Sequence, residues 1–201
     1  MTSVANALVV LPAIDASDPW SIFPVAKHFI DARWERREVL IKQSREITRD
    51  SKKLIVALHR LQMFDTAGLA AATDKPLARI AQLCATVNTT IGHPVNKERF
   101  YRDLRPGMEE LIEALSFRHY LQTGKLLSYE ETVSALAASG HSVTPELYIL
   151  GLMDLGGELM RYATSQATNR AVGIVFAVCH FMQQFFHGIP FPFFVCMYVR
   201  E

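Results

Sequence analysis

The chain has 201 residues, of which 50% are hydrophobic and 20% are charged, and its formal net charge is +1. This length suits one domain with a substantial core, and the composition excludes a disordered or fibrous protein. The near-neutral charge identifies no class of partner, because a local basic stripe can exist within a neutral total.

Helical periodicity dominates the sequence and predicts an all-α bundle of about six helices with a long N-terminal helix. We expect residues 1–17 to form a flexible leader, 18–188 the helical domain and 189–201 a divergent apolar tail. The first helix is predicted from about Asp18–Ser21 to Leu61, long enough to reach beyond a compact core and dock onto another subunit. Apolar residues at helical spacing mark its expected buried side: Ile22, Val25, Phe29, Ala32, Val39, Ile47, Leu54 and Leu58.

Two helices are predicted in the middle of the chain. The second covers about Leu77–Val87 and ends at the loop "NTTIGHP", and the third runs over about Asn96–Gln122. A short fourth helix is predicted in "LSYEETVSALAASG", where Ser128 and Glu131 form a capping box and Gly140 provides a stop.

The fifth and sixth predicted helices complete the bundle. Thr144 followed by Pro145 is a strong start signal for the fifth helix, which reaches about Thr164. The sixth covers about Ala171–Phe186, within an apolar stretch that polar residues and prolines interrupt. Because a spanning helix needs roughly 20 mostly apolar residues, we expect no membrane contact.

The three cysteines stand far apart in the chain and include no CxxC pair: Cys84, Cys179 and Cys196. An odd number at this spacing argues against a disulfide scaffold and against a zinc site. It indicates a reducing compartment.

The predicted third helix carries two carboxylates, Glu110 and Glu113. Its main apolar face, at about 100° per residue, consists of Leu104, Met108, Leu111, Ile112 and Leu115. Glu110 falls on a second apolar flank, between Phe117 and Leu121, and Glu113 lies just beyond, toward the polar side. Residues three apart share a face, so both carboxylates can converge on one point.

The predicted fifth helix is nearly free of charge, with Asp154 and Glu158 as its two acids between Leu147 and Met160. They lie four residues apart, on one face. A helix that is apolar nearly all round is buried, and a buried carboxylate has to be paired, protonated or bound to a metal. Three glycines of this helix predict a close approach of another backbone or a ligand: Gly151, Gly156 and Gly157.

Packing of these two helices would bring four carboxylates together, and such a cluster cannot stay ionised without a cation. Ligation by oxygen alone favours Mg²⁺ or Mn²⁺ over zinc. The sequence argues against a di-iron site, because no Glu is followed by His three residues later. Two ordinary interpretations stay open. The Glu pair could be a solvated helix edge, and Arg161 could neutralise one acid of the fifth helix in a structural salt bridge.

Residues 33–53 form a basic run with eight Lys or Arg against four acids. A salt-bridged solvated face is one interpretation, and the surplus of four positive charges also suits contacts with phosphates. The candidate nucleic-acid-binding residues are Arg33, Arg37, Arg45, Arg49, Lys52 and Lys53. His59 and His119 lie on apolar helices, where we expect hydrogen-bonded core residues.

Three segments resemble the translin superfamily, and within it the translin-associated branch more than translin itself: "KQSREITRDSKKLIVALHRL", "GMEELIEALSFRHYLQTGKLLS" and "SVTPELYILGLMDLGGELMR". The resemblance is dense from about Ala32 to Ala167. It implies an all-α chain that joins translin in a hetero-oligomeric barrel, in the cytoplasm and nucleus. The implied activity is Mg²⁺-dependent endoribonuclease cleavage of small single-stranded RNA, such as silencing passenger strands and transfer-RNA precursor fragments. Single-stranded DNA is a further ligand.

The resemblance also assigns roles to residues. The catalytic and metal-binding acids of the branch match Glu110, Glu113, Asp154 and Glu158. We expect Glu110 and Asp154, taken as the more enclosed pair, to anchor the metal. The other two acids would ligate through water or orient the nucleophile. A non-catalytic subunit that binds translin and nucleic acid is the alternative.

The chain departs from the branch near its C-terminus. The branch continues after the sixth helix with a long amphipathic helix, whereas this sequence ends in "IPFPFFVCMYVRE", which lacks a helical period. We therefore expect apolar surface of the bundle to be left uncovered.

Overall fold

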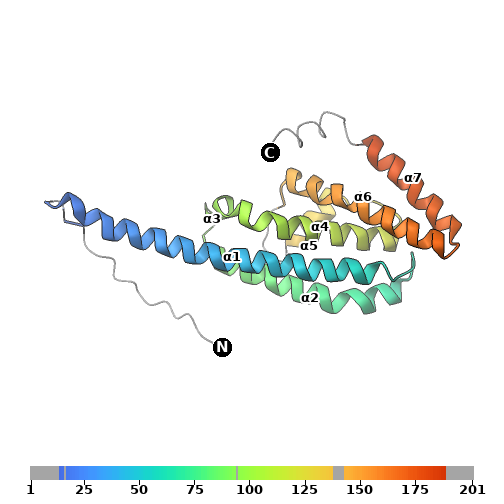
Figure 1. Cartoon of the computed structure of the whole chain (residues 1–201), viewed down its shortest axis with the longest axis horizontal. Coiled ribbons are helices and arrows are strands. Elements are labelled where there is room, and N and C mark those ends of the chain that lie inside the picture. Colours follow the sequence, from blue (N-terminus) through green and yellow to red (C-terminus); the bar gives the residue numbers. More distant parts are fainter. Residues whose placement is uncertain (1–13, 16, 94, 138–142, 189–201) are drawn as a thin grey trace.

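The computed structural model describes residues 14–15, 17–93, 95–137 and 143–188, and Figure 1 shows these residues as a bundle of helices. A short 3₁₀ helix, η1 (Pro19–Ser21), precedes α1 (Ile22–Leu58), α2 (Thr66–Ile91), α3 (Val95–Arg99) and α4 (Tyr101–Thr123). After α4 come α5 (Tyr129–Ala137), α6 (Pro145–Thr168) and α7 (Val172–Gly188). No strand occurs among the described residues, and the predicted all-α fold is confirmed. The expected tail at 189–201 and nearly all of the expected leader lie outside the described residues.

The helices stack in the order α2, α1, α4, α6 and α7, with α1 and α4 at the centre. The second half of α1 lies between α2 and α4, so apolar residues on opposite sides of this helix are buried. Leu40, Ile47, Leu54 and Leu58 of α1 are almost completely excluded from solvent. The core is thus continuous across the layers.

The first part of α1 projects beyond the bundle (Figure 1). Ile22, Phe29 and Val39 were predicted to be buried, and that prediction is wrong: all three are exposed. The prediction failed because helical spacing identifies an apolar face, and a face is buried only where another element covers it. Other large apolar side chains before Glu35 are also exposed: Trp20 of η1, and Phe23, Ile30 and Trp34 of α1.

Two predicted helix boundaries in the middle of the chain are wrong. α2 begins at Thr66, eleven residues before the expected start, because the Asp65 side chain accepts a hydrogen bond from the Gly68 N–H and caps the helix. Pro76 lies inside this helix rather than at its beginning. α2 also continues into the expected loop as far as Ile91, and Gly92 with φ +72° follows the helix.

The predicted third helix is in fact two helices. α3 ends at Arg99, and the buried Phe100 separates it from α4 with φ −101° and ψ 7°. α4 ends as expected near Gln122, and Gly124 caps it in the left-handed conformation. That conformation favours glycine because it has no Cβ.

The capping signals in the second half of the chain are confirmed. The Ser128 Oγ accepts from the Glu131 N–H at 3.1 Å, and the Glu131 carboxylate accepts from the Ser128 N–H at 2.8 Å. The Thr144 hydroxyl accepts from the Leu147 N–H at the start of α6. α6 runs four residues further than predicted, whereas the Gly140 stop lies outside the described residues.

Two sequence-based exclusions can be compared with the described residues. Cys84 is buried and Cys179 is exposed, and neither of these two described cysteines forms a disulfide. Cys196 lies outside the described residues. No described helix has both the length and the apolar character needed to cross a membrane.

Gly151 permits the close contact between α4 and α6 that positions the candidate site. A Cβ added to Gly151 would lie 2.7 Å from the Ile112 Cβ and 2.9 Å from the Glu109 carbonyl oxygen. At Gly156 the nearest atom, Met182 Cε, would be 3.3 Å away, whereas a Cβ at Gly157 meets nothing within 4 Å. The close approach predicted for the three glycines is therefore wrong for Gly157.

We expect Gly151→Ala to destabilise the protein by about 1–3 kcal/mol, because the added methyl group overpacks the α4–α6 contact. Gly157→Ala is the matched control. It adds the same group to the same helix in open space and should stabilise the protein by about 0.5–1 kcal/mol. Thermal unfolding of both variants measures the difference. Equal destabilisation by the two substitutions would contradict this account of the α4–α6 contact.

Candidate metal centre and nucleic-acid groove

The contact between α4 and α6 brings the four predicted carboxylates into one neighbourhood, with Glu110 and Glu113 on α4 and Asp154 and Glu158 on α6. Burial raises the pKa of Glu113 to about 8, and the negative charges of the other three acids add to this effect. The four side chains therefore act on one another electrostatically, as the sequence predicted for helices that pack together.

The degree of burial differs from the prediction. Glu113, which was placed toward the polar side, is only 6% exposed, whereas Asp154 is exposed. Glu110 has 17% of its side chain exposed. The expectation that Glu110 and Asp154 are the more enclosed pair is therefore wrong. The reason is that α4 is covered on two sides, by α1 and α6, so that a single apolar face underestimates what is buried.

Lys52 of α1 supplies a positive charge to this neighbourhood. Its Nζ lies 3.6 Å from the Oε2 of Glu110. Burial raises the pKa of Glu110, and the charge of Lys52 opposes that rise. Burial and the charge of Glu158 raise the pKa of Asp154, again against the effect of Lys52.

Glu158 is engaged by two other side chains. The Arg161 Nη1 lies 2.9 Å from the Glu158 Oε1, and the His59 Nε2 is hydrogen-bonded to the Glu158 Oε2. The His59 ring also packs against Phe117 at 4.9 Å between ring centroids. His59 was predicted as a hydrogen-bonded core residue, and its contact with a candidate site residue was missed. Its spacing from Lys52, seven residues along one helix and so on one face, is the signal that could have revealed it.

The donor set can be compared with the requirements of a divalent cation. Within the described residues no group of three or more His, Cys, Asp or Glu side chains is arranged to hold a metal ion. Two of the acids are occupied instead, Glu110 by Lys52 and Glu158 by His59 and Arg161. In chemical type the four carboxylates nevertheless fit Mg²⁺ or Mn²⁺, which prefer oxygen ligands. Burial, together with the charges of the other three acids, raises the pKa of Glu113, and a bound cation would oppose that rise.

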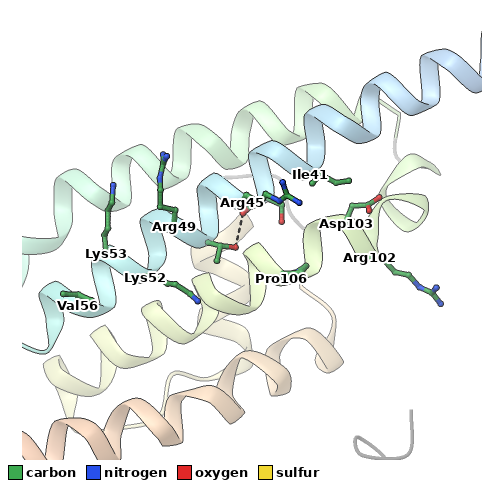
Figure 2. A pocket seen from close by; sticks show the side chains of 11 residues that line it. Ile41, Arg45, Arg49, Lys52, Lys53, Val56, Arg102, Asp103 and Pro106 are labelled. Carbon is green, nitrogen blue, oxygen red and sulfur yellow. Dashed lines mark hydrogen bonds between the residues drawn. The ribbon is translucent and has the colours of Figure 1, made fainter. Parts of the chain in front are cut away.

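A groove of about 930 Å³ adjoins this neighbourhood, between α1 and α4 (Figure 2). Basic side chains dominate the charged part of its lining: Arg45, Arg49, Lys52 and Lys53 from α1 and Arg102 from α4. Figure 2 shows Lys52 extending from α1 toward α4. One side chain therefore belongs both to the groove and to the carboxylate neighbourhood.

Arg33 and Arg37, the other two predicted nucleic-acid-binding residues, do not line the groove. Arg37 donates two hydrogen bonds to the Asp103 carboxylate, at 2.8 and 3.1 Å. Asp103 itself lines the groove. Arg33 is exposed on the projecting part of α1, and the groove does not include it. Arg102 lines the groove and was missed, because it stands outside the basic run of the sequence.

Comparison with models of protein families assigns the chain to one family. A profile described as the Translin family matches residues 35–191. The chain belongs to the Translin family. The match includes α1 from Glu35 onward and every later helix, so it contains all four carboxylates and the whole groove.

Three curated relatives give the extent of the similarity. The chain is 29% identical to translin-associated protein X of Rattus norvegicus over 204 aligned residues, which cover 88% of this chain and 70% of the rat protein. It is 29% identical to the translin-associated protein X homolog of Schizosaccharomyces pombe, over 73% of this chain and 62% of that protein. An uncharacterized protein of Methanocaldococcus jannaschii is 30% identical, over 75% of this chain and 60% of its own length. The alignments thus span about two thirds of each relative.

A solved structure supports the fold of this Translin family chain. The crystal structure of apo-NeC3PO superposes with a TM-score of 0.56 and 20% sequence identity. The superposition covers 74% of this chain and 69% of the other. At this identity the similarity concerns the arrangement of helices.

Proposed function

We propose that this chain is the catalytic subunit of a translin-containing, Mg²⁺-dependent endoribonuclease that acts on small single-stranded RNA. The observation that carries the proposal is the juxtaposition of four carboxylates, from α4 and α6, with a groove lined by basic side chains. An anionic strand bound in such a groove lies next to acids that suit a divalent cation. The family membership and the name of the curated relatives support translin as the partner.

The positions of the side chains suggest a separate role for each group of residues. Glu110, Glu113, Asp154 and Glu158 would hold Mg²⁺ or Mn²⁺, which supplies an activated water and neutralises charge on the phosphate. The basic residues of the groove bind phosphates without reading the base sequence. His59 and Arg161 fix the side chain of Glu158, which limits its rotation toward solvent.

The projecting part of α1 supports an assembly with another subunit. Its exposed Phe29 and Trp34 have no covering element within the described residues. Exposed clusters of large apolar side chains mark protein interfaces more often than free surface. This observation supports the partner part of the proposal independently of the carboxylates.

A non-catalytic subunit that binds translin and nucleic acid is the alternative. The ion pairs Lys52–Glu110 and Arg161–Glu158 favour it, because they neutralise two of the acids within the chain. Under this alternative the carboxylates are structural, and titration with Mg²⁺ leaves the thermal stability of the protein unchanged.

Cleavage of single-stranded RNA by the full chain together with translin tests the proposal. We expect Mg²⁺ to support cleavage and EDTA to stop it, because carboxylate oxygens suit Mg²⁺ and EDTA removes the ion from solution. Asp154→Ala removes one of the four candidate metal ligands and should abolish cleavage without unfolding the protein, since the exposed Asp154 side chain contributes little to folding. Equal cleavage by the wild type and this variant, or cleavage that survives EDTA, would favour the non-catalytic alternative.

A further inference from the structure

Lys52 has a position that no other described groove residue shares. It lines the groove between α1 and α4, and its Nζ is also ion-paired with Glu110 of the carboxylate neighbourhood. Coulombic attraction from Lys52 acts on Glu110, Glu113 and Asp154. This cation therefore acts on three of the four acids that would hold a divalent cation.

The neighbouring cations are held by other acids. Lys53 and Arg49 pair with the buried Asp50, at 3.6 and 3.4 Å, and Arg79 of α2 pairs with the same carboxylate at 2.8 Å. Their charges are thus paired with Asp50 and not with the four acids. They contribute to the groove without contacting the four acids.

The pair between Lys52 and Glu110 is easily exchanged. A separation of 3.6 Å is longer than a hydrogen bond, and the Lys52 side chain is 64% exposed. An ion pair whose cation is this exposed is weak, because water competes for the ammonium group. A phosphate group entering the groove offers Lys52 an alternative anion at little cost.

We propose that Lys52 is a positioning residue that couples the binding of RNA to the binding of the divalent cation. With the groove empty, Lys52 neutralises Glu110 and competes with the cation for that carboxylate. With a strand in the groove, Lys52 turns to a phosphate and leaves Glu110 free for the cation. The inference rests on the proposed function, because it takes the four carboxylates as the cation site.

The coupling has to be reciprocal. If a bound strand raises the affinity for the cation, the cation raises the affinity for the strand by the same factor. We expect a factor of about 5 to 10, which lies at the lower end of typical coupling between two sites. Such coupling would raise the occupancy of the cation site when substrate is present.

Mn²⁺ binding to the full chain tests the inference without any measurement of cleavage. The signal of free Mn²⁺ in electron paramagnetic resonance is titrated with and without a short 2′-O-methylated RNA, and binding by the RNA alone is subtracted. Lys52→Met removes the charge and keeps most of the alkyl chain. Lys53→Met is the matched control, since it removes one charge from the same groove but not from Glu110. Lys52→Arg restores the charge.

We expect the RNA to raise the Mn²⁺ affinity of the wild type, of Lys53→Met and of Lys52→Arg. Lys52→Met should bind Mn²⁺ about 5 to 10 times more tightly than the wild type without RNA, and should lose most of the gain on adding it. If the wild type binds Mn²⁺ but the two methionine variants behave alike, the inference is overturned and the proposed function stands. If the wild type binds no Mn²⁺ with or without RNA, both are overturned.

Discussion

Glu113→Gln is expected to abolish RNA cleavage and at the same time to stabilise the metal-free protein. Glu113 is the most buried of the four acids, and burial together with the negative charges of its neighbours raises its pKa to about 8. Glutamine has nearly the shape of the protonated acid and carries no charge. We expect cleavage to fall by on the order of 100-fold or more, as when other groups that stabilise charge in an active site are removed.

The pH dependence follows from the direction of the pKa change. An unfolded Glu has a pKa of about 4.5, so between about pH 4.5 and pH 8 the folded wild type holds a proton that the unfolded chain has lost. The stability of the metal-free wild type should therefore fall as the pH rises through this interval and level off above it. Glu113→Gln removes this dependence. Its melting temperature should match that of the wild type near pH 5 and exceed it by several degrees at about pH 8.

Two controls separate this effect from a general change in charge. Glu130→Gln removes a carboxylate from the exposed surface of α5 and should leave the melting profile unchanged over the same pH interval. Added Mg²⁺ should raise the melting temperature of the wild type at pH 8 more than that of Glu113→Gln, because a ligand stabilises the folded state that binds it. A Glu113→Gln variant that melts below the wild type at pH 8 would show that the carboxylate is a structural partner.

Local signals in the sequence predicted the parts of the fold that depend on neighbouring residues. The capping box of Ser128 and Glu131 and the Thr144 cap form as expected, because their hydrogen bonds join residues three apart. The same locality explains why Asp154 and Glu158 could be placed on one face of a helix. The four-carboxylate neighbourhood followed from one further assumption, that the two helices pack together, and Gly151 allows that contact.

Features that depend on packing between distant elements could not be predicted. Phe29 looks like a core residue in the sequence, but the part of α1 that carries it extends past α2 and α4. Glu113 looks half-polar on a helical wheel, and its burial comes from two helices that a wheel does not contain. The contact of His59 with Glu158 joins residues 99 positions apart. The charge and spacing of residues in the sequence identified the candidate site residues. Which of them are buried, and which side chains they pair with, could be seen only from the arrangement of the helices.

The double variant Arg45→Ala/Arg49→Ala is expected to weaken the binding of single-stranded RNA by on the order of 10-fold to 100-fold at low salt. Both side chains line the groove beside Lys52 (Figure 2). Each phosphate contact to a single strand contributes about 0.7 to the slope of log affinity against log salt, so the slope should decrease by about 1.4. Binding titrations of the full chain over a range of salt concentrations measure both quantities.

The matched control removes two arginines from the projecting part of the same helix, Arg33→Ala/Arg36→Ala. Both residues are exposed, and neither lines the groove, although both belong to the basic run of the sequence. Because long-range attraction depends on total charge, this control should lose some affinity at low salt but keep most of the salt slope. Should the control lose as much of the slope as the groove variant, the strand would follow the whole basic run along α1. If only the Arg45→Ala/Arg49→Ala variant loses salt slope, the phosphates of the strand lie in the groove, next to Lys52 and the four carboxylates.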